Sequence, residues 1–283
     1  MTLLFEVGDA SAAARVPGWS IEPGAYAYVV GSRAGTPNCA AALADEPFDT
    51  GIFGLPVGRI VAAVAQRPED YAPLHRAVDD QSRARGYRYV TRRIGPLDRA
   101  ESRALESNGY HLADVGVTLE HDLREVSRAA DAEVRVATSA DVEQLACTCG
   151  GIFRTSRYYG EPLFAEDRAT ELHRVWIRNC HRGRADAVLT LVQSGEPVAF
   201  VTCAVDRDKL GDIALFGVGP AAQGHGVGAR LLRAALAWFA ERAERVHVKT
   251  QAVNYRALRM YERGGFRQIR AELTYGRTLG AGT

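Results

Sequence analysis

One short segment restricts the folds open to this chain more than any other, because it places clustered glycines between an apolar strand and an amphipathic helix. Residues 212–218 alternate like a strand, residues 223–228 read QGHGVG, and residues 228–242 carry apolar side chains at helical spacing. Another apolar strand is expected at residues 246–250. This order of strand, helix and strand predicts a crossover between two parallel strands, and therefore a sheet covered by helices.

The glycine cluster predicts a binding site for a diphosphate. Glycines allow successive backbone N–H groups to converge on an anion, and the N-terminus of the following helix adds a partial positive charge. The dinucleotide-binding fingerprint GxGxxG is the competing interpretation, but that motif follows the first strand of a βαβ unit. Here a strand pair at 187–192 and 198–206, joined by a turn at 194–197, precedes the loop, which disfavours a dinucleotide site.

Two motifs in the expected order resemble the GNAT acetyltransferases. QGHGVG is similar to the QxxGxG loop of that family, and Asn254, Ala257, Tyr261, Gly265 and Phe266 match its NxxAxxxYxxxGF segment. The resemblance implies an α/β (α+β) fold with a mixed twisted sheet of GNAT type. It also implies acetyl-CoA as the co-substrate and an N-acyltransferase reaction.

The same resemblance assigns residues to the donor site. The strand that ends at Val218 is expected to splay from its neighbour and to offer backbone groups to the pantetheine arm. Tyr261 is expected to protonate the departing thiolate, since a phenol with an ordinary pKa of about 10 is protonated at neutral pH. The alternatives are that Tyr261 is a half-buried helix residue that packs on Phe266, and that Asn254 is a plain helix N-cap, which does not exclude a contact with the cofactor. The expected cofactor-binding residues are Leu215, Phe216, Val218, Gln223, Gly224, His225, Gly226, Val227, Gly228, Ala229 and Asn254.

A narrower resemblance concerns the acceptor. Residues 153–164 read FRTSRYYGEPLF, similar to the FxxSRYYxDPxF signature of nucleotide-sugar amine acetyltransferases, of which the dTDP-fucosamine group is closest. Residues 49–60 extend the similarity, whereas Glu161 replaces the usual Asp and leaves the sugar open. Arginine suits an anionic acceptor and aromatic rings suit a base or sugar, although both also serve ordinary packing. The expected acceptor-binding residues are Ser156, Arg157, Tyr158, Tyr159 and Gln251.

The implied reaction is direct attack of a neutral amine on the thioester carbonyl, so a base must first remove the ammonium proton. Asp212, His247, Glu272 and an ordered water are all candidates for that base. Other functions stay open: another acyl donor, such as a different acyl-CoA or an aminoacyl-tRNA, a small natural-product amine as acceptor, or a noncatalytic CoA-binding protein.

Local signals predict several further elements. Residues 48–58 contain glycines that indicate a turn leading into an apolar strand, and helices are expected at 71–84 and 99–107. Thr138 and Asp141 resemble a capping box at the start of a helix.

A length of 283 residues is enough for two domains. Residues 104–119 and 260–275 share the order helix, glycine, aromatic residue and strand, which suggests that the first half is a partial copy of the second. We expect an unassigned N-terminal extension at 1–45, a smaller, partial GNAT-like module at 46–121, a linker at 122–132 and a GNAT domain at 133–280.

Composition excludes some partners. Thirty-five basic residues nearly balance thirty-four acidic ones, which disfavours a nucleic-acid partner. Five scattered cysteines fit neither a disulfide framework nor a zinc site, so no metal is expected. No apolar stretch approaches the length of a membrane span, and the start of the chain does not resemble a signal peptide, so a cytoplasmic protein is expected. The oligomeric state is left open, with a homodimer among the options.

Overall fold

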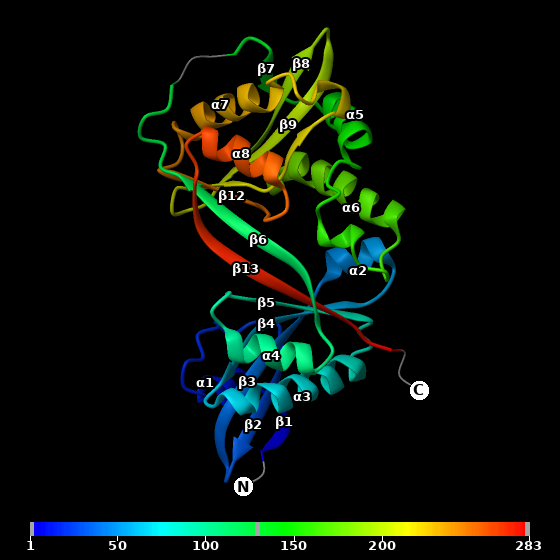
Figure 1. The fold of residues 1–283 in the computed structure, drawn as a ribbon, viewed down its shortest axis with the longest axis vertical. Coiled ribbons are helices and arrows are strands. Elements are labelled where there is room, and N and C mark those ends of the chain that lie inside the picture. Colours follow the sequence, from blue (N-terminus) through cyan, green and yellow to red (C-terminus); the bar gives the residue numbers. More distant parts are fainter. Residues whose placement is uncertain (1–2, 128–130, 281–283) are drawn as a thin grey trace. The chain divides into compact units, whose positions relative to one another are not determined.

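The structure is a computed structural model that describes residues 3–127 and 131–280 (Figure 1). The chain divides by its packing into two compact units. Unit 1 comprises Met1–Val115 and Glu272–Thr283, and unit 2 comprises Gly116–Ala271. This division differs from the linker expected at 122–132, of which residues 128–130 lie outside the described part of the chain. No helix in the described ranges combines the length and apolar character needed to span a membrane.

Unit 1 contains a sheet with helices packed on both of its faces. The first four strands are antiparallel neighbours in sequence order, whereas the fourth and fifth are parallel. Residues 1–45, which the sequence left unassigned, thus contribute three strands. The elements are β1 (Leu4–Gly8), α1 (Ala10–Ala14), β2 (Ala27–Arg33), β3 (Thr36–Asp45), α2 (Pro47–Phe53), β4 (Val57–Ala65), η1 (Pro68–Asp70), α3 (Tyr71–Ala84), β5 (Tyr89–Ile94) and α4 (Arg99–Ser107).

The turn predicted at 48–58 was wrong over its first half, because a short helix forms there. Pro47 occupies the first turn of α2, where its fixed φ favours a helix and its missing N–H costs nothing. Gly54 ends the helix with a left-handed φ of 69°. The helices predicted at 71–84 and 99–107 are confirmed by α3 and α4.

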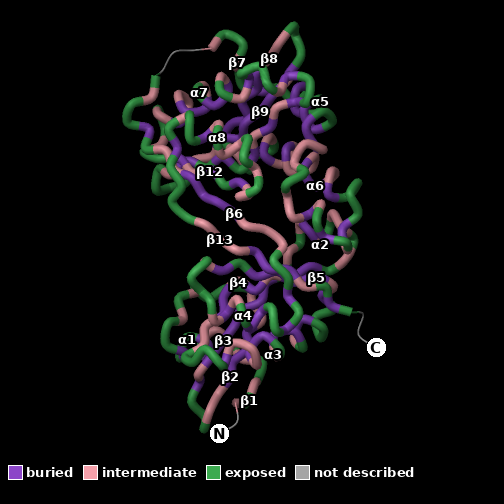
Figure 2. The backbone as a smooth tube through the Cα atoms, in the orientation of Figure 1, coloured by how far each residue is buried: buried purple, intermediate pink, exposed green. Residues whose placement is uncertain are grey.

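Unit 2 is a mixed sheet between two pairs of helices. Val246 and Val248 pack with Leu231 and Phe239 in the core under α7 and α8, and a second core lies between α5, α6 and the opposite face. Figure 2 shows buried residues concentrated along the strands of this sheet, such as β9 and β12. The elements are β6 (His111–His121), β7 (Val134–Val136), α5 (Ser139–Cys149), η2 (Arg157–Tyr159), α6 (Glu166–Asn179), η3 (Cys180–Arg184), β8 (Ala187–Gln193), β9 (Glu196–Val205), β10 (Leu210–Ile213), β11 (Phe216–Val218), η4 (Pro220–Ala222), α7 (Val227–Phe239), β12 (Arg245–Gln251), α8 (Tyr255–Arg263) and β13 (Arg267–Thr278).

The capping box predicted at the start of α5 is present. The Asp141 backbone N–H donates to the Thr138 hydroxyl at 3.3 Å, and the Thr138 backbone N–H donates to the Asp141 carboxylate at 2.7 Å. Both bonds satisfy N–H groups that the first helical turn would otherwise leave without acceptors.

Each unit's sheet is completed by a strand from the half of the sequence that builds the other unit. β6 follows α4, yet its residues 116–121 pair with β12 of unit 2. β13 follows α8, yet its residues 273–278 pair with β5 of unit 1. The division therefore falls within two strands, and no change of composition marks it in the sequence.

Candidate donor and acceptor site

The strand predicted at 212–218 is interrupted, and the interruption opens a fork in the sheet of unit 2. β10 pairs in parallel with β12 as far as the pair Ile213 and Val248, whereas the pairing found for β11 is with β9. Thr202 of β9 stabilises the break through two hydrogen bonds to Leu215. The Leu215 N–H donates to the Thr202 hydroxyl at 2.9 Å, and the Thr202 N–H donates to the Leu215 carbonyl at 3.0 Å. The single strand was a wrong prediction because apolar alternation continues through the break.

Every second residue of β11 directs its backbone N–H and C=O groups to the open side of this fork. Gly219 N–H donates to the Val198 carbonyl at 2.8 Å, so the odd-numbered residues of this segment direct their backbone groups to β9. Phe216 and Val218 therefore direct theirs to the open side. Leu215 was expected to bind the donor. Both of its backbone groups are instead hydrogen-bonded to Thr202 of β9, so they face away from the open side of the fork.

The glycine loop follows directly and ends in the N-terminus of α7. Gly224 and Gly226 have φ values of 85° and 75°, in the left-handed region that glycine adopts without strain, and nothing lies within 4 Å of where their Cβ atoms would be. In the described part of the chain, no acceptor is found for the backbone N–H groups of residues 224–229. Several unpaired N–H groups at a helix N-terminus suit a diphosphate.

The remaining loop residues anchor this arrangement. Val227 is buried in the core, while the side chains of His225 and Ala229 are exposed. A Cβ at Gly228 would lie 2.9 Å from the Met260 sulfur, so this glycine permits the close approach of α7 to α8. The backbone N–H groups of His225, Val227 and Ala229 can therefore contact a ligand even if their side chains do not.

The side-chain amide of Gln223 forms hydrogen bonds through both its nitrogen and its oxygen. Its Nε2 donates to the Val218 carbonyl at 3.0 Å, and its Oε1 accepts from Arg256. Nothing in the sequence distinguishes Arg256 except its position two residues after Asn254. Gln223 thus fixes the orientation of the loop relative to β11 and α8.

Tyr261 lies on α8 with its ring against the fork. The residue is 3% exposed and its ring packs edge-on against Phe216, with 6.1 Å between centroids, and against Phe266 at 5.5 Å. Burial raises the pKa of the phenol, so the hydroxyl keeps its proton well beyond neutral pH. Among the described residues the hydroxyl has no hydrogen-bond partner. The ring therefore packs on Phe266, as the alternative expects, and the hydroxyl is still available to a ligand in the fork.

Asn254 acts as a helix cap. Its Oδ1 accepts from Ala257 N–H at 3.3 Å, and its Nδ2 donates to the Thr250 hydroxyl at 3.1 Å. The capping alternative is thus correct for this residue. It fixes the start of α8 and, through that helix, the height of Tyr261 beside the fork.

The acceptor segment folds around a buried histidine of α6. The rings of Phe153 and Tyr159 are stacked on His173, with centroids 4.6 and 5.8 Å away, and Tyr158 meets it edge-on at 6.3 Å. Burial lowers the pKa of His173 to about 4, so its ring is neutral and its Nδ1–H donates to the Ala169 carbonyl at 2.8 Å. The aromatic residues of the motif are therefore anchored by packing, as the alternative interpretation holds.

Arg157 and Ser156 are the polar residues of this segment that remain half-buried. The guanidinium of Arg157 lies 4.2 Å from the centroid of the Tyr158 ring and donates to its hydroxyl at 2.6 Å. The neighbouring Thr155, which sequence reasoning passed over, donates to Gln251 Oε1 at 3.2 Å. This bond attaches the acceptor segment to the end of β12, beside the fork.

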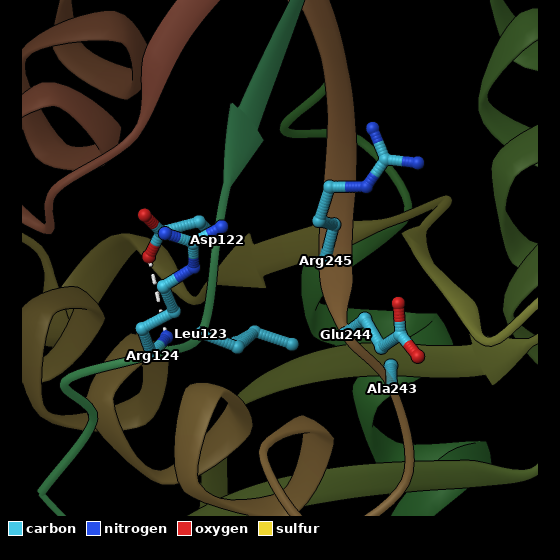
Figure 3. A pocket seen from close by; sticks show the side chains of 6 residues that line it. All are labelled: Asp122, Leu123, Arg124, Ala243, Glu244 and Arg245. Atoms are coloured by element: carbon cyan, nitrogen blue, oxygen red, sulfur yellow. Dashed lines mark hydrogen bonds between the residues drawn. The ribbon is translucent and has the colours of Figure 1, made fainter.

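A separate hollow lies at the opposite end of β12 (Figure 3). β12 begins at Arg245, which lines the hollow, and the fork opens beyond Val248. None of the predicted site residues lines it, so it is not part of the candidate site. Its lining residues are Asp122, Leu123, Arg124, Ala243, Glu244 and Arg245.

The described residues of unit 1 form a comparable fork, but they do not supply the groups that would bind a diphosphate there. β4 pairs with β5 only as far as Ile60 and Arg92 and then continues without it to Ala65. The segment that follows contains no glycine and places Glu69 and Asp70 at the start of α3. Asp70 is buried and paired with Arg33, whereas the exposed carboxylate of Glu69 repels an anion.

An ion pair closes this fork of unit 1. Arg92 donates to the Val61 carbonyl of β4 at 3.1 Å and to both carboxylate oxygens of the buried Glu101 at 2.7 and 3.0 Å. Leu105 stands four residues before Gly109, as Tyr261 stands four before Gly265. The described residues of unit 1 therefore supply neither a glycine loop for an anion after β4 nor a phenol at the position that corresponds to Tyr261.

Comparisons with known proteins point to one family. The sequence profile of the acetyltransferase (GNAT) family matches residues 153–266. The spore coat polysaccharide biosynthesis protein SpsD of Bacillus subtilis (strain 168) is 31% identical over 127 residues, which is 44% of this chain and 44% of that relative. The match thus spans less than half of the relative's length.

Two solved structures share the fold over nearly the whole chain. A GCN5-related N-acetyltransferase from Sphaerobacter thermophilus has a TM-score of 0.63 at 15% identity and covers 98% of this chain and 95% of its own. A tandem GNAT protein from the clavulanic acid biosynthesis pathway has a TM-score of 0.58 at 15% identity, with complete coverage of both chains.

Proposed function

We propose that this chain, whose residues 153–266 match the acetyltransferase (GNAT) family profile, is an N-acetyltransferase that moves the acetyl group of acetyl-CoA to the primary amine of a nucleotide-linked amino sugar. The fork in unit 2 carries the proposal. It combines a glycine loop with free N–H groups, an open strand edge and a buried phenol within one stretch of the sheet.

The donor half of the site is proposed as follows. The N–H groups of residues 224–229 hold the diphosphate of the co-substrate, and the open edge of β11 receives the pantetheine arm. The N–H groups of Phe216 and Val218 face the fork, where they can polarise the thioester carbonyl. Tyr261 then gives its proton to the sulfur as the carbon–sulfur bond breaks.

The acceptor half rests on the segment that borders the fork. Arg157, Ser156 and the half-buried Tyr159 offer a cation, a hydroxyl and an aromatic ring, which suit an anionic nucleotide sugar. The name of the Bacillus subtilis relative, a polysaccharide biosynthesis protein, supports an acceptor from sugar metabolism. The proposal therefore commits to an amine on a sugar linked to a nucleotide.

Mass spectrometry tests this function directly. The protein is incubated with acetyl-CoA and a panel of nucleotide-linked amino sugars that includes dTDP-fucosamine, and we expect one of them to gain a single acetyl group while free CoA appears in equal amount. The matched control is the same sugar already N-acetylated, which has no free amine and should not react. Failure of every amine in the panel, with an enzyme that binds acetyl-CoA, would refute the proposed acceptor class.

A further inference from the structure

Three ionisable side chains lie in a row across three neighbouring strands of unit 2. In the strand register, Asp212 of β10 is the partner of His247 on β12, and His247 is the partner of Glu120 on β6. Val246 and Val248 pack under α7, so His247 between them points to the other face of the sheet. The row therefore lies on the face opposite α7 and α8.

The hydrogen bonding of His247 fixes which ring nitrogen can accept a proton. Its Nε2 lies 2.8 Å from Oε2 of Glu120, and because a carboxylate accepts, Nε2 carries the hydrogen. Nδ1 then holds the lone pair, and among the described residues it has no partner. Arg245 Nη1 also donates to Oε2 of Glu120, at 3.3 Å, which holds this carboxylate in place.

Asp212 completes the row on the other side of His247. The residue as a whole is exposed, yet the protein around its carboxylate desolvates it and raises its pKa, while the charge on His247 acts in the opposite direction. Cys180 at the end of α6 is near enough to Asp212 to interact with it electrostatically. Lys249, two residues after His247, is the next charged group on this face of β12.

The row sits directly below the fork. Asp212 and His247 form the pair that precedes Ile213 and Val248, after which β10 and β12 no longer pair. Tyr261 reaches the fork from α8, on the opposite face. Gln251, which bonds to the acceptor segment through Thr155, shares the face of His247. Side chains on the face of His247 are therefore placed to contact the acceptor, whereas Tyr261, on the other face, is placed to contact the donor.

We propose that His247, oriented by Glu120, is the base that removes the proton from the acceptor's ammonium group, and that Asp212 holds this ammonium in place. This inference rests on the proposed function. His247 Nδ1 takes one proton from R–NH3+ and later releases it to solvent. The neutral amine attacks the thioester carbon, the C–N bond forms and the C–S bond breaks. A second proton leaves the nitrogen and replaces the one that Tyr261 gave to the thiolate.

This assignment selects among the candidates that the sequence left open. His247 is placed as the base and Asp212 as its neighbour, whereas Glu272 lies on β13 and is not one of the three residues of the row. Glu120 was not a candidate, because it lies more than a hundred residues away in the sequence and next to the expected linker. Only the pairing of β6 with β12 brings it to His247.

The test compares His247→Ala with the wild type, using acetyl-CoA and dTDP-fucosamine, and the other amines of the panel if that sugar is not a substrate. We expect kcat/KM to fall by about 10²-fold or more. The pH profile of the variant should lack one ionisation that the wild type shows, since the acceptor amine ionises identically in both reactions. Added imidazole should restore part of the lost rate, which a merely structural role of His247 would not allow.

Two further variants separate the roles in the row. Glu120→Gln should lower kcat and change the pH profile less than His247→Ala does, and Asp212→Asn should raise KM for the amine more than it lowers kcat. Asp208→Asn, in the exposed turn before β10, is the matched control and should leave both constants unchanged.

The outcomes distinguish this inference from the proposed function. If the wild type acetylates none of the amines, the function fails and the inference fails with it. If the wild type is active and His247→Ala keeps its rate and its pH profile, only the base assignment is overturned. A loss of the ionisation in Asp212→Asn but not in His247→Ala would also overturn it.

Discussion

Replacing Tyr261 with phenylalanine is expected to lower kcat by about 10²- to 10⁴-fold, the range that a lost general acid produces. The phenol is buried against Phe216 at the fork, and its raised pKa keeps the proton on the oxygen at neutral pH. Phenylalanine preserves the ring packing, so the affinity for acetyl-CoA should change little. Steady-state kinetics with calorimetric titration of acetyl-CoA measures both quantities.

Tyr255→Phe is the matched control for this experiment. Tyr255 lies in the first turn of the same helix but is 66% exposed, so removal of its hydroxyl should leave kcat unchanged. Thermal unfolding of both variants shows whether α8 is intact. Wild-type turnover by Tyr261→Phe would exclude this residue as the acid and would leave it with a packing role.

Replacing Gly226 with valine is expected to weaken acetyl-CoA binding by about 10- to 100-fold. Gly226 has a φ of 75°, and a β-branched residue held there costs about 1–3 kcal/mol. The loop can relieve this strain by rotating its backbone, but the rotation turns the N–H groups at the start of α7 away from the diphosphate. Calorimetric titration gives the dissociation constant for acetyl-CoA.

Gly195→Val separates strain from ligand binding. Gly195 has a φ of 86° in the turn between β8 and β9, and as at Gly226 nothing lies within 4 Å of its Cβ position. Both substitutions should lower the unfolding temperature, but only Gly226→Val should weaken acetyl-CoA binding. Equal losses of affinity in the two variants would mean that general destabilisation, and not the loop, accounts for the effect.

Local features of this fold could be predicted from the sequence because nearby residues determine them. The spacing of Gln223, Gly224 and Gly226 gave the loop, the apolar periodicity gave α7, and Thr138 with Asp141 gave the start of α5. Each depends on residues within one or two turns of chain, so one sequence is sufficient.

Features that depend on distant residues could not be predicted in this way. The break between β10 and β11 is held by Thr202, which belongs to another strand, and the alternation of apolar residues continues across it. The exchange of β6 and β13 between the units also leaves no trace in composition. The pairing of Glu120 with His247 follows only from that exchange.

The acceptor segment shows the same limit. Its motif drew attention to Tyr158 and Tyr159, but the buried His173 on which they are arranged is a single histidine in a helix with no distinguishing pattern. Burial removes its charge, and the ring then serves as an aromatic packing residue. A sequence alone does not reveal which histidines are buried and neutral.

A crystal structure of the protein with acetyl-CoA tests the central claim most directly. We expect one molecule per chain, in unit 2, with diphosphate oxygens about 3 Å from backbone nitrogens of residues 224–229 and with the thioester at the fork beside Tyr261. Unit 1 should hold none, because Glu69 and Asp70 occupy its helix start and Arg92 spans its fork. A diphosphate bound elsewhere, with the N–H groups of this loop directed away from it, would contradict the account.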